Sequence, residues 1–417
     1  MGGTRLSGEF LEVRQDRNVL HVFGDLRLST LPYMTAGLHR AVDVSAYRDI
    51  TIDLTSLSSI QPSVVPPLAA YMRRMIRDVK VDFSVLEPRS ISVRSKLQSL
   101  GLLHYLDHRK YAKPKPNSSD PALLQFMNHD EREVAVDKVM NSALRTSRLD
   151  RRQTAALDWA VNEITDNVLS HAKSPVGGFL ICNKIPKTNI IEFTVADSGI
   201  GVARSLGITD DTEAVEKAIQ EGVTRNKSTN QGNGLFGTYR LSLISRGIFV
   251  LKSRNGNLFV EKDGGMHIRR DGVPFPGTYV VCQIDCDDPD LIERALSFSD
   301  IKHTPPFDYI ERKHEQGTET PVIKAVDICK TFGSRSSGQE ARTYILNVIS
   351  GSDTGSVKID FSDIHVVSSS FADEVFGKLF VELGPMTFMR SIDVVNAVST
   401  VSGLIDRAIV LRSKTGL

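Results

Sequence analysis

Cysteine is scarce in this chain, which has four in 417 residues: Cys182, Cys282, Cys286 and Cys329. No two of them form a Cys-x-x-Cys pair, so neither a zinc site nor a disulfide framework is expected. We expect the thiols to be buried and reduced, as in a cytoplasmic protein. Charge of one sign is also lacking, because the formal net charge is only +1. The overall charge therefore gives no reason to expect nucleic acid or acidic lipid as a partner.

Long hydrophobic runs are missing as well. The longest, such as residues 64–71, are far too short to span a bilayer. Residues 1–5 lack the apolar core of a secretory signal peptide. These absences predict a cytoplasmic protein without a membrane segment. The composition, 41% hydrophobic and 24% charged, is that of a globular protein with enough apolar material for real cores.

At roughly 100–200 residues per domain, the length predicts about two to four domains. Residues 111–121 are rich in Pro, Lys and Ser, a composition that favours a linker. Residues 296–319 contain two adjacent prolines and a charged run, and form the second predicted linker. Three domains are therefore expected, at residues 1–110, 122–295 and 320–417.

Both outer domains alternate strands with helices, a pattern that predicts α/β layers. Strands are expected at residues 19–23, 50–54, 81–86, 357–361 and 391–395. Helices are expected after residue 32, at 66–78, before 106, and at 338–348, 371–383 and 398–410. The stretch DLTSL from Asp53 also matches the stretch DFSDI from Asp360. We interpret the two ends as related domains around a different middle domain.

The middle domain contains a strongly helical stretch at residues 157–171. Its apolar stripe consists of Leu157, Val161, Ile164 and Val168. Glu163, Asn167 and His171 follow at helical spacing on another face. A carboxylate one turn from a carboxamide suits a nucleotide site, because the carboxylate can polarise a hydroxyl and the amide oxygen can bind Mg²⁺. Taken alone, this spacing is more often that of a solvated polar face.

A predicted strand at residues 191–196 leads into Asp197-Ser198-Gly199-Ile200-Gly201. Glycines allow a sharp turn beside a flat ligand. A strand-end carboxylate can accept a hydrogen bond from an exocyclic amine such as that of adenine. The alternative for this motif alone is an ordinary turn.

A glycine-rich loop, GNGLFG at residues 232–237, precedes a predicted helix at 238–245. Such a loop exposes backbone N–H groups and the positive helix end to phosphates. No Gly-Lys-Ser/Thr follows, so the loop is not a Walker motif. No strand leads directly into it, so it is not a dinucleotide fingerprint either.

The three signals together resemble the GHKL ATPase superfamily, which includes DNA gyrase B, heat-shock chaperones, histidine kinases and mismatch-repair ATPases. Asn162-Glu163 with Asn167 and His171 resembles the N box, residues 197–201 the G1 box and residues 232–237 the G2 box. Gly277-Thr278 resembles the late Gly-Thr that supports the adenine-binding aspartate. The resemblance covers about 150 residues, and both order and spacing fit.

This resemblance implies a binding site for ATP and Mg²⁺. Asn167 would hold Mg²⁺, Asp197 would bind the adenine amine, and Thr278 would support Asp197. The glycines and one leucine would line the base or the phosphates: Gly199, Gly201, Gly232, Gly234, Leu235 and Gly237. Residues 202–231 would form a lid, from which Arg225 and Lys227 would either reach phosphate or remain solvated.

Within the superfamily, Glu163 with Asn167 and His171 is most similar to the anti-sigma-factor serine kinases, where the glutamate is the proposed general base. Residues 10–108 resemble a STAS domain, the fold of anti-sigma-factor antagonists, and residues 320–417 resemble a STAS-like domain. The positions that match the phosphorylated serine of that family are Ser63 and Ser370. The alternative for both serines is that they cap the helix that follows.

The expected fold is therefore α/β: a two-layer sandwich of the GHKL (Bergerat) type with a STAS-like domain on each side. Two functions remain open. The first is an ATP-dependent protein serine kinase or slow ATPase that acts on a STAS surface in its own chain or in a partner. The second is a non-catalytic switch or scaffold in which nucleotide orders the lid and controls docking. Protein partners are expected through the STAS-like domains, and a homodimer is a further expectation.

Overall fold

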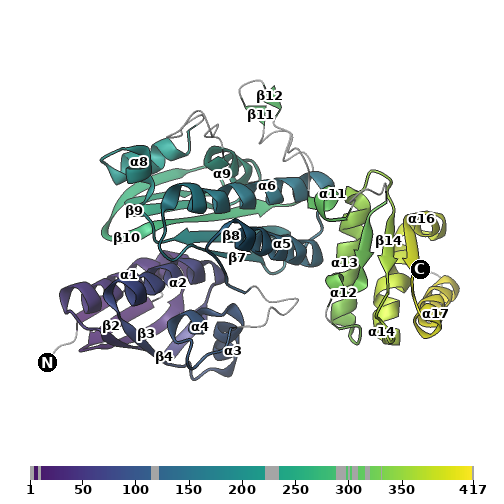
Figure 1. Cartoon of the computed structure of the whole chain (residues 1–417), viewed down its shortest axis with the longest axis horizontal. Coiled ribbons are helices and arrows are strands. Elements are labelled where there is room, and N and C mark those ends of the chain that lie inside the picture. Colours follow the sequence, from purple (N-terminus) through teal and green to yellow (C-terminus); the bar gives the residue numbers. More distant parts are fainter. Residues whose placement is uncertain are drawn as a thin grey trace. The chain divides into compact units, whose positions relative to one another are not determined.

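The computed structural model describes residues 4–7, 11–113, 122–220, 234–287, 297–298, 301–302, 309–314, 320–329 and 331–415. The fold is mixed α/β, as the sequence predicts, with 50% of residues in helices and 26% in strands. The chain forms two compact units (Figure 1). The first comprises Met1–Asp137, Ala160–Ile185 and Ile190–Asp285. The second comprises Lys138–Trp159, Pro186–Asn189 and Cys286–Leu417.

The amino-terminal part of the first unit contains a five-stranded sheet in the order β1-β2-β3-β4-β5. The strands are β1 (Thr4–Ser7), β2 (Leu11–Asp16), β3 (Val19–Leu26), β4 (Asp49–Ile60) and β5 (Asp82–Leu86). The first three pair antiparallel, and β3, β4 and β5 pair parallel. In β4, Ile50, Ile52 and Leu54 are buried and alternate with less buried residues, as expected for a strand.

Helices connect the strands of this sheet: α1 (Leu31–His39), α2 (Val65–Arg74), α3 (Ile91–Leu100) and α4 (Leu102–Leu106). A π-helical turn, η4 (Met75–Val79), continues α2. Eight consecutive residues of α2, from Val65 to Met72, are buried. A helix that is buried all round must be covered on more than one side. Residues of α2 share a hydrophobic core with those of the sheet in its own part of the chain, and the helix also packs on a second sheet.

That second sheet has the order β6-β7-β8-β10-β9, and all its pairs are antiparallel. Its strands are β6 (Leu124–Phe126), β7 (Gly178–Lys184), β8 (Ile190–Asp197), β9 (Phe249–Val260) and β10 (Met266–Asp285). All eight residues of β8 are buried. Because neighbouring side chains point to opposite faces of a strand, both faces of this sheet are covered.

Helices cover one face of the second sheet. They are α9 (Gly234–Ile244), which packs on β9 and β10, and those parts of α5 (His129–Thr146) and α6 (Arg151–Asn167) that belong to the first unit (Figure 1). A π-helical turn, η5 (Val168–Ala172), continues α6. Two further helices, α7 (Val202–Leu206) and α8 (Asp211–Ala218), follow β8.

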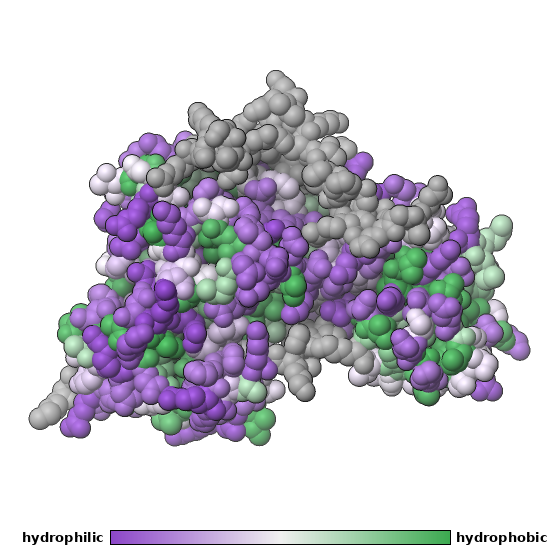
Figure 2. Space-filling model, viewed as in Figure 1, coloured by the Kyte–Doolittle hydropathy of each residue, from purple (hydrophilic) through white to green (hydrophobic). Residues whose placement is uncertain are grey.

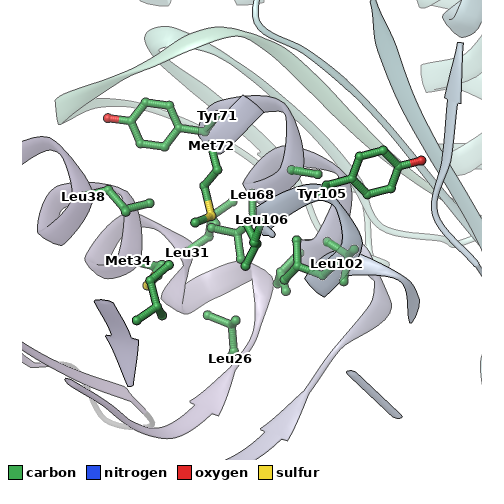
Figure 3. Close-up of a cluster of buried hydrophobic side chains, with 14 of the residues drawn as sticks. Leu26, Leu31, Met34, Leu38, Leu68, Tyr71, Met72, Leu102, Tyr105 and Leu106 are labelled. Carbon is green, nitrogen blue, oxygen red and sulfur yellow. The ribbon is translucent and has the colours of Figure 1, made fainter. Parts of the chain in front are cut away.

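The opposite face of this sheet packs on α1 and α2 of the amino-terminal part. Tyr71 and Tyr105 point from their helices toward the second sheet (Figure 3), where they meet Phe275 and Phe179 at ring-centroid distances of 6.1 and 5.3 Å. Buried residues of the two parts form one hydrophobic core. The amino-terminal part and the second sheet, predicted from the sequence as separate domains, therefore share a core.

The second unit contains a parallel three-stranded sheet, β13-β14-β15. Its strands are β13 (Val322–Lys324), β14 (Val357–Asp360) and β15 (Ile392–Val395). Its helices are α11 (Tyr309–His314), α12 (Ala325–Ile328), α13 (Arg335–Gly351), α14 (Ser369–Ala372), α15 (Lys378–Leu383), α16 (Pro385–Ser391) and α17 (Ser399–Thr415). A π-helical turn, η6 (Asp373–Gly377), joins α14 to α15.

Residues 296–319, predicted as a linker, contain a short pair of strands and a helix. The strands are β11 (Ser297–Phe298) and β12 (Ile301–Lys302). In α11, Tyr309, Ile310 and His314 are buried, and the His314 ring hydrogen-bonds to the Tyr344 hydroxyl at 2.8 Å. This segment therefore contributes to the core of the second unit.

Asn347 of α13 organises the polar interior of the second unit. Its side-chain amide donates hydrogen bonds to the carbonyl oxygens of Leu144 and Ser147 at 2.8 and 2.7 Å. Its oxygen accepts the N–H of Leu149 at 3.0 Å. One buried side chain thus satisfies three backbone groups in the last turn of α5 and in the residues that follow it.

The surface and the cysteines fit the composition. On the face shown in Figure 2, hydrophilic residues predominate among the described residues of the first unit. Among the helices that the structure describes, none is long and apolar enough to cross a membrane. All four cysteines are buried and free, as the sequence predicts.

Candidate functional site

The helix α6 and its continuation η5 carry the first predicted motif. Glu163 and Asn167 lie one turn apart on α6, and His171 follows in η5; all three are half-buried. Burial raises the pKa of Glu163, the nearby Asp166 raises it further, and Arg132 opposes the rise. Glu163 therefore holds a proton more strongly than an exposed glutamate does, a property of a general base.

Asp197 ends β8, the most deeply buried strand of the sheet. Its Oδ1 accepts the N–H of Gly199 at 2.6 Å, and the carboxylate also accepts the N–H of Thr278. Burial raises the pKa of Asp197 to about 7, against these two hydrogen bonds and the charge of Arg74. A buried carboxyl with so high a pKa is typical of a functional site.

The turn after Asp197 packs directly on the end of η5. The N–H of Ile200 donates to the carbonyl oxygen of Ala172 at 2.8 Å. A Cβ atom at Gly199 would overlap that same carbonyl oxygen and lie 2.9 Å from Asp197 Oδ1. Only glycine fits here, because a backbone group occupies the space of a side chain. This contact joins the second motif to the helix of the first.

Gly277 and Thr278 of β10 close the other side of Asp197. Gly277 has a φ of +115°, and a Cβ atom there would lie 2.6 Å from Ser198 Cα. The Thr278 hydroxyl hydrogen-bonds to that of Ser253 in β9 at 3.1 Å, and Ser253 Oγ also accepts the N–H of Val202 at 2.8 Å. Ser253 thus links the threonine to the start of α7. No local pattern indicates a role for Ser253, because its partners lie 25 and 51 residues away.

The third motif also reaches the first. A Cβ atom at Gly234, where α9 begins, would overlap Oε2 of Glu163 and lie 3.1 Å from its Cβ. The carbonyl oxygen of Gly234 accepts the Thr238 hydroxyl at 2.8 Å, within the first turn of α9. Gly237 is buried and Leu235 is half-buried in this helix. Gly232, Arg225 and Lys227 lie outside the described residues.

Gly201 supports the same arrangement. It has a φ of +81°, which favours glycine, and a Cβ atom there would lie 2.8 Å from Arg254 Cγ. The structure therefore brings together Glu163, Asn167 and His171 on one helix, the turn that follows Asp197, and Gly234. These residues are spread over more than 70 positions of the sequence.

Ser63, a predicted phosphoacceptor, is placed differently. It lies in a 3₁₀ turn, η3 (Pro62–Val64), is 4% exposed, and its hydroxyl hydrogen-bonds to the Glu192 carboxylate on β8. Gln283 donates to Glu192 as well, at 2.8 Å. In this conformation the hydroxyl is not accessible to a phosphoryl donor. Ser63 serves instead to satisfy a buried carboxylate between two packed sheets.

Ser370, the other predicted phosphoacceptor, is half-buried at the start of α14. The residue that caps this helix is Ser368, whose hydroxyl oxygen accepts the N–H of Phe371 at 3.0 Å. Ser370 hydrogen-bonds to Ser368 through their hydroxyl groups at 3.0 Å. The capping role weighed for Ser370 therefore belongs to the serine two positions earlier.

Two contacts of Ser198 were not predicted. Its hydroxyl donates to the carbonyl oxygen of Ala70 in α2 at 2.7 Å. Its own carbonyl oxygen accepts Nη1 of Arg74 at 2.9 Å. The turn after Asp197 is therefore tied to the amino-terminal part of the chain, more than 120 residues earlier.

Comparison with protein families matches residues 338–402 to a family described as "STAS-like domain of unknown function (DUF4325)". This match covers most of α13 together with β14 and β15, and confirms the STAS-like assignment of the carboxyl-terminal part. No curated protein matches the chain.

Proposed function

We propose that the first unit binds ATP with Mg²⁺ in a pocket of the GHKL type, between α6–η5, the turn after Asp197 and the start of α9. The observation that carries this proposal is the convergence of three motifs. Gly199 and Ile200 contact Ala172, and Gly234 contacts Glu163. The motif proposed to bind adenine thus contacts the end of α6–η5, and the motif proposed to bind phosphate contacts Glu163, one turn before Asn167.

The adenine end of the proposed pocket is formed by Asp197. Its carboxylate is fixed by the N–H groups of Gly199 and Thr278, which leaves acceptor capacity for the exocyclic amine of adenine. The glycines at 199 and 277 keep side chains out of the surrounding space. These features fit a flat base held edge-on by a buried acid.

The residues at the phosphate end of the proposed pocket suit a metal ion that binds only together with nucleotide. Among the described residues, no group of three or more His, Cys, Asp or Glu side chains is placed to hold a metal ion. Mg²⁺ usually takes one or two protein ligands together with substrate phosphates. The Asn167 oxygen would be such a ligand, and bound Mg²⁺ would neutralise phosphate charge. Metal binding should therefore require nucleotide.

We propose Glu163 as the general base. Its carboxylate would take a proton from water or a serine hydroxyl while that oxygen bonds to the γ-phosphorus and ADP leaves. Base catalysis of this kind contributes roughly 10²–10⁴ in rate. The raised pKa of Glu163, caused mainly by burial, supports this role.

The amino-terminal part is proposed to be STAS-like, as the carboxyl-terminal part is. In both, the first aspartate of the matched stretch closes the same turn. Asp53 Oδ1 accepts the N–H of Thr55, and Asp360 Oδ1 accepts that of Ser362, each at 2.9 Å. STAS-type surfaces suit protein partners, which we propose as the targets of this protein.

Turnover is tested with γ-labelled ATP and Mg²⁺. The parent protein should release labelled phosphate or label a serine, and Glu163→Gln should slow this by roughly 10²-fold or more with little loss of ATP affinity. Glu216→Gln, an exposed glutamate of α8, is the matched control. A Glu163→Gln variant as active as the parent would exclude this glutamate as the base.

The second candidate, a nucleotide-gated switch, is favoured by the buried position of Ser63 and by the contacts of Ser198. Because the adenine turn is bonded to Ala70 and Arg74, a shift of this turn on nucleotide binding reaches α2 directly. Limited proteolysis of residues 202–231 should slow when ATP and Mg²⁺ are added. Equal cleavage with and without nucleotide would count against gating.

A further inference from the structure

A cavity of the first unit lies beside the turn after Asp197. It has a volume of about 670 Å³, within the range of roughly 300–1,000 Å³ typical of small-molecule sites. Its walls come from the end of α2 with η4, the residues after η5, and the segment from Ser198 through α7 to the start of α8. Of the residues proposed to bind nucleotide, only Gly199 lines it.

The lining of this cavity is rich in positive charge. Five cationic side chains line it: Arg74, Arg77, Lys173, Arg204 and Arg254. Only two carboxylates do, those of Asp78 and Asp211. This excess stands out in a chain whose formal net charge is +1. Such a concentration of cations favours an anionic ligand.

The two carboxylates are already engaged. Asp78 accepts Nε of Arg74 at 3.2 Å and lies 3.8 Å from Nη1 of Arg77. Asp211 accepts the backbone N–H of Asn255 at 3.2 Å. Within the described part of the chain, Lys173, Arg204 and Arg254 form no ion pair with any carboxylate. Three cations of the cavity thus keep their hydrogen-bond donors for a ligand.

Two of these cations are held in unusual backbone conformations. Lys173 and Arg254 have φ values of +51° and +52°, in the left-handed region that non-glycine residues rarely adopt. Glycine would be the better residue for the backbone at both positions. The side chains that stand there instead both line the cavity.

We propose that this cavity binds a small molecule bearing two or more phosphate groups. Guanidinium groups form paired hydrogen bonds with phosphate oxygens, and lysine adds a compact charge. Several cations spaced around one cavity match an anion with several charged groups better than a single carboxylate. Apart from Gly199, the residues that line this cavity differ from those proposed to bind nucleotide, and the proposal does not rest on nucleotide binding.

The test uses inorganic pyrophosphate and isothermal titration calorimetry on the full-length protein. The parent should bind pyrophosphate, with an affinity that falls as salt is added. The double variant Lys173→Gly/Arg254→Gly should weaken binding by about tenfold or more, because two charge-assisted contacts are lost. These substitutions relieve the backbone at both sites, so folding should be retained.

The matched control is Lys187→Gly/Arg246→Gly. Both residues are exposed, both have left-handed φ values, +65° and +55°, and neither lines the cavity. The control should bind pyrophosphate like the parent. A cavity variant that binds as tightly as the parent would overturn the proposal, as would a parent that does not bind pyrophosphate.

A second variant guards against loss of folding. Arg204→Glu reverses a charge on an exposed residue of α7, and should weaken pyrophosphate binding while circular dichroism stays unchanged. Gly234→Ala, which places a methyl group at the phosphate end of the proposed nucleotide pocket, should leave pyrophosphate binding unchanged, which separates this site from that pocket. Loss of binding in Gly234→Ala but not in Arg204→Glu would assign pyrophosphate to the nucleotide pocket and overturn the proposal.

Discussion

Replacing Asp197 with asparagine should remove a pH dependence of stability that this carboxyl group imposes. Burial raises its pKa from 3.8 to about 7, so the folded state binds this proton more tightly than the unfolded state. The stability that the proton contributes is fully present below about pH 4 and is lost as the pH rises through about 7. Between about pH 5 and pH 8 the loss amounts to about 2–3 kcal/mol, at 1.36 kcal/mol per unit of difference.

The assay is urea unfolding followed by far-ultraviolet circular dichroism at several pH values. The free energy of unfolding of the parent minus that of Asp197→Asn isolates this group from others that titrate. The difference should fall by about 2–3 kcal/mol from about pH 5 to pH 8. Asp406→Asn, an exposed aspartate of α17, is the matched control and should show no such trend. A constant difference for Asp197→Asn would refute the reasoning.

Two further substitutions test the packing of each unit. Gly234→Ala places a methyl group against the Glu163 carboxylate and should lower ATP affinity or turnover at least about tenfold. The control is Gly272→Ala, where a Cβ atom meets nothing within 4 Å. Equal activity of the two variants would contradict the contact between Gly234 and Glu163. Asn347→Ala leaves three buried backbone groups without their partner and should lower the free energy of unfolding, measured in urea, by about 3 kcal/mol or more. The control is Ser336→Ala, an exposed position on the same helix, which should lower it by less than about 0.5 kcal/mol. A small effect of Asn347→Ala would mean that water replaces the amide.

Local patterns predicted much of the structure. The apolar stripe from Leu157 marked α6, because spacing alone fixes which side chains share a face. The strand expected at residues 50–54 lies within β4. The motifs at Asp197 and Gly234 were also visible, since their glycines stand where backbone or carboxylate fills the space of a side chain. The sequence thus predicted the helix, the strand and the glycine-containing turns that carry the motifs of the candidate site.

Long-range packing was not predictable in the same way. A helix was expected at residues 66–78, but residues 64–71 were otherwise interpreted only as an apolar run too short for a membrane. A helix without a polar face already indicates burial on several sides. Nothing local shows that α2 lies between two sheets, that Ser63 faces Glu192, or that Arg74 bonds to Ser198. Those contacts depend on how separate elements meet, which spacing along the chain does not encode.

The most direct test of the central proposal is calorimetric titration of the full-length protein with ATP in the presence of Mg²⁺. The parent should bind one ATP per chain, and Asp197→Asn should weaken binding by at least about tenfold through loss of the adenine contact. Mg²⁺ alone should give no heat, because Asn167 needs the phosphates to complete the metal site. A parent that does not bind ATP, or an Asp197→Asn variant that binds it as tightly, would contradict the account.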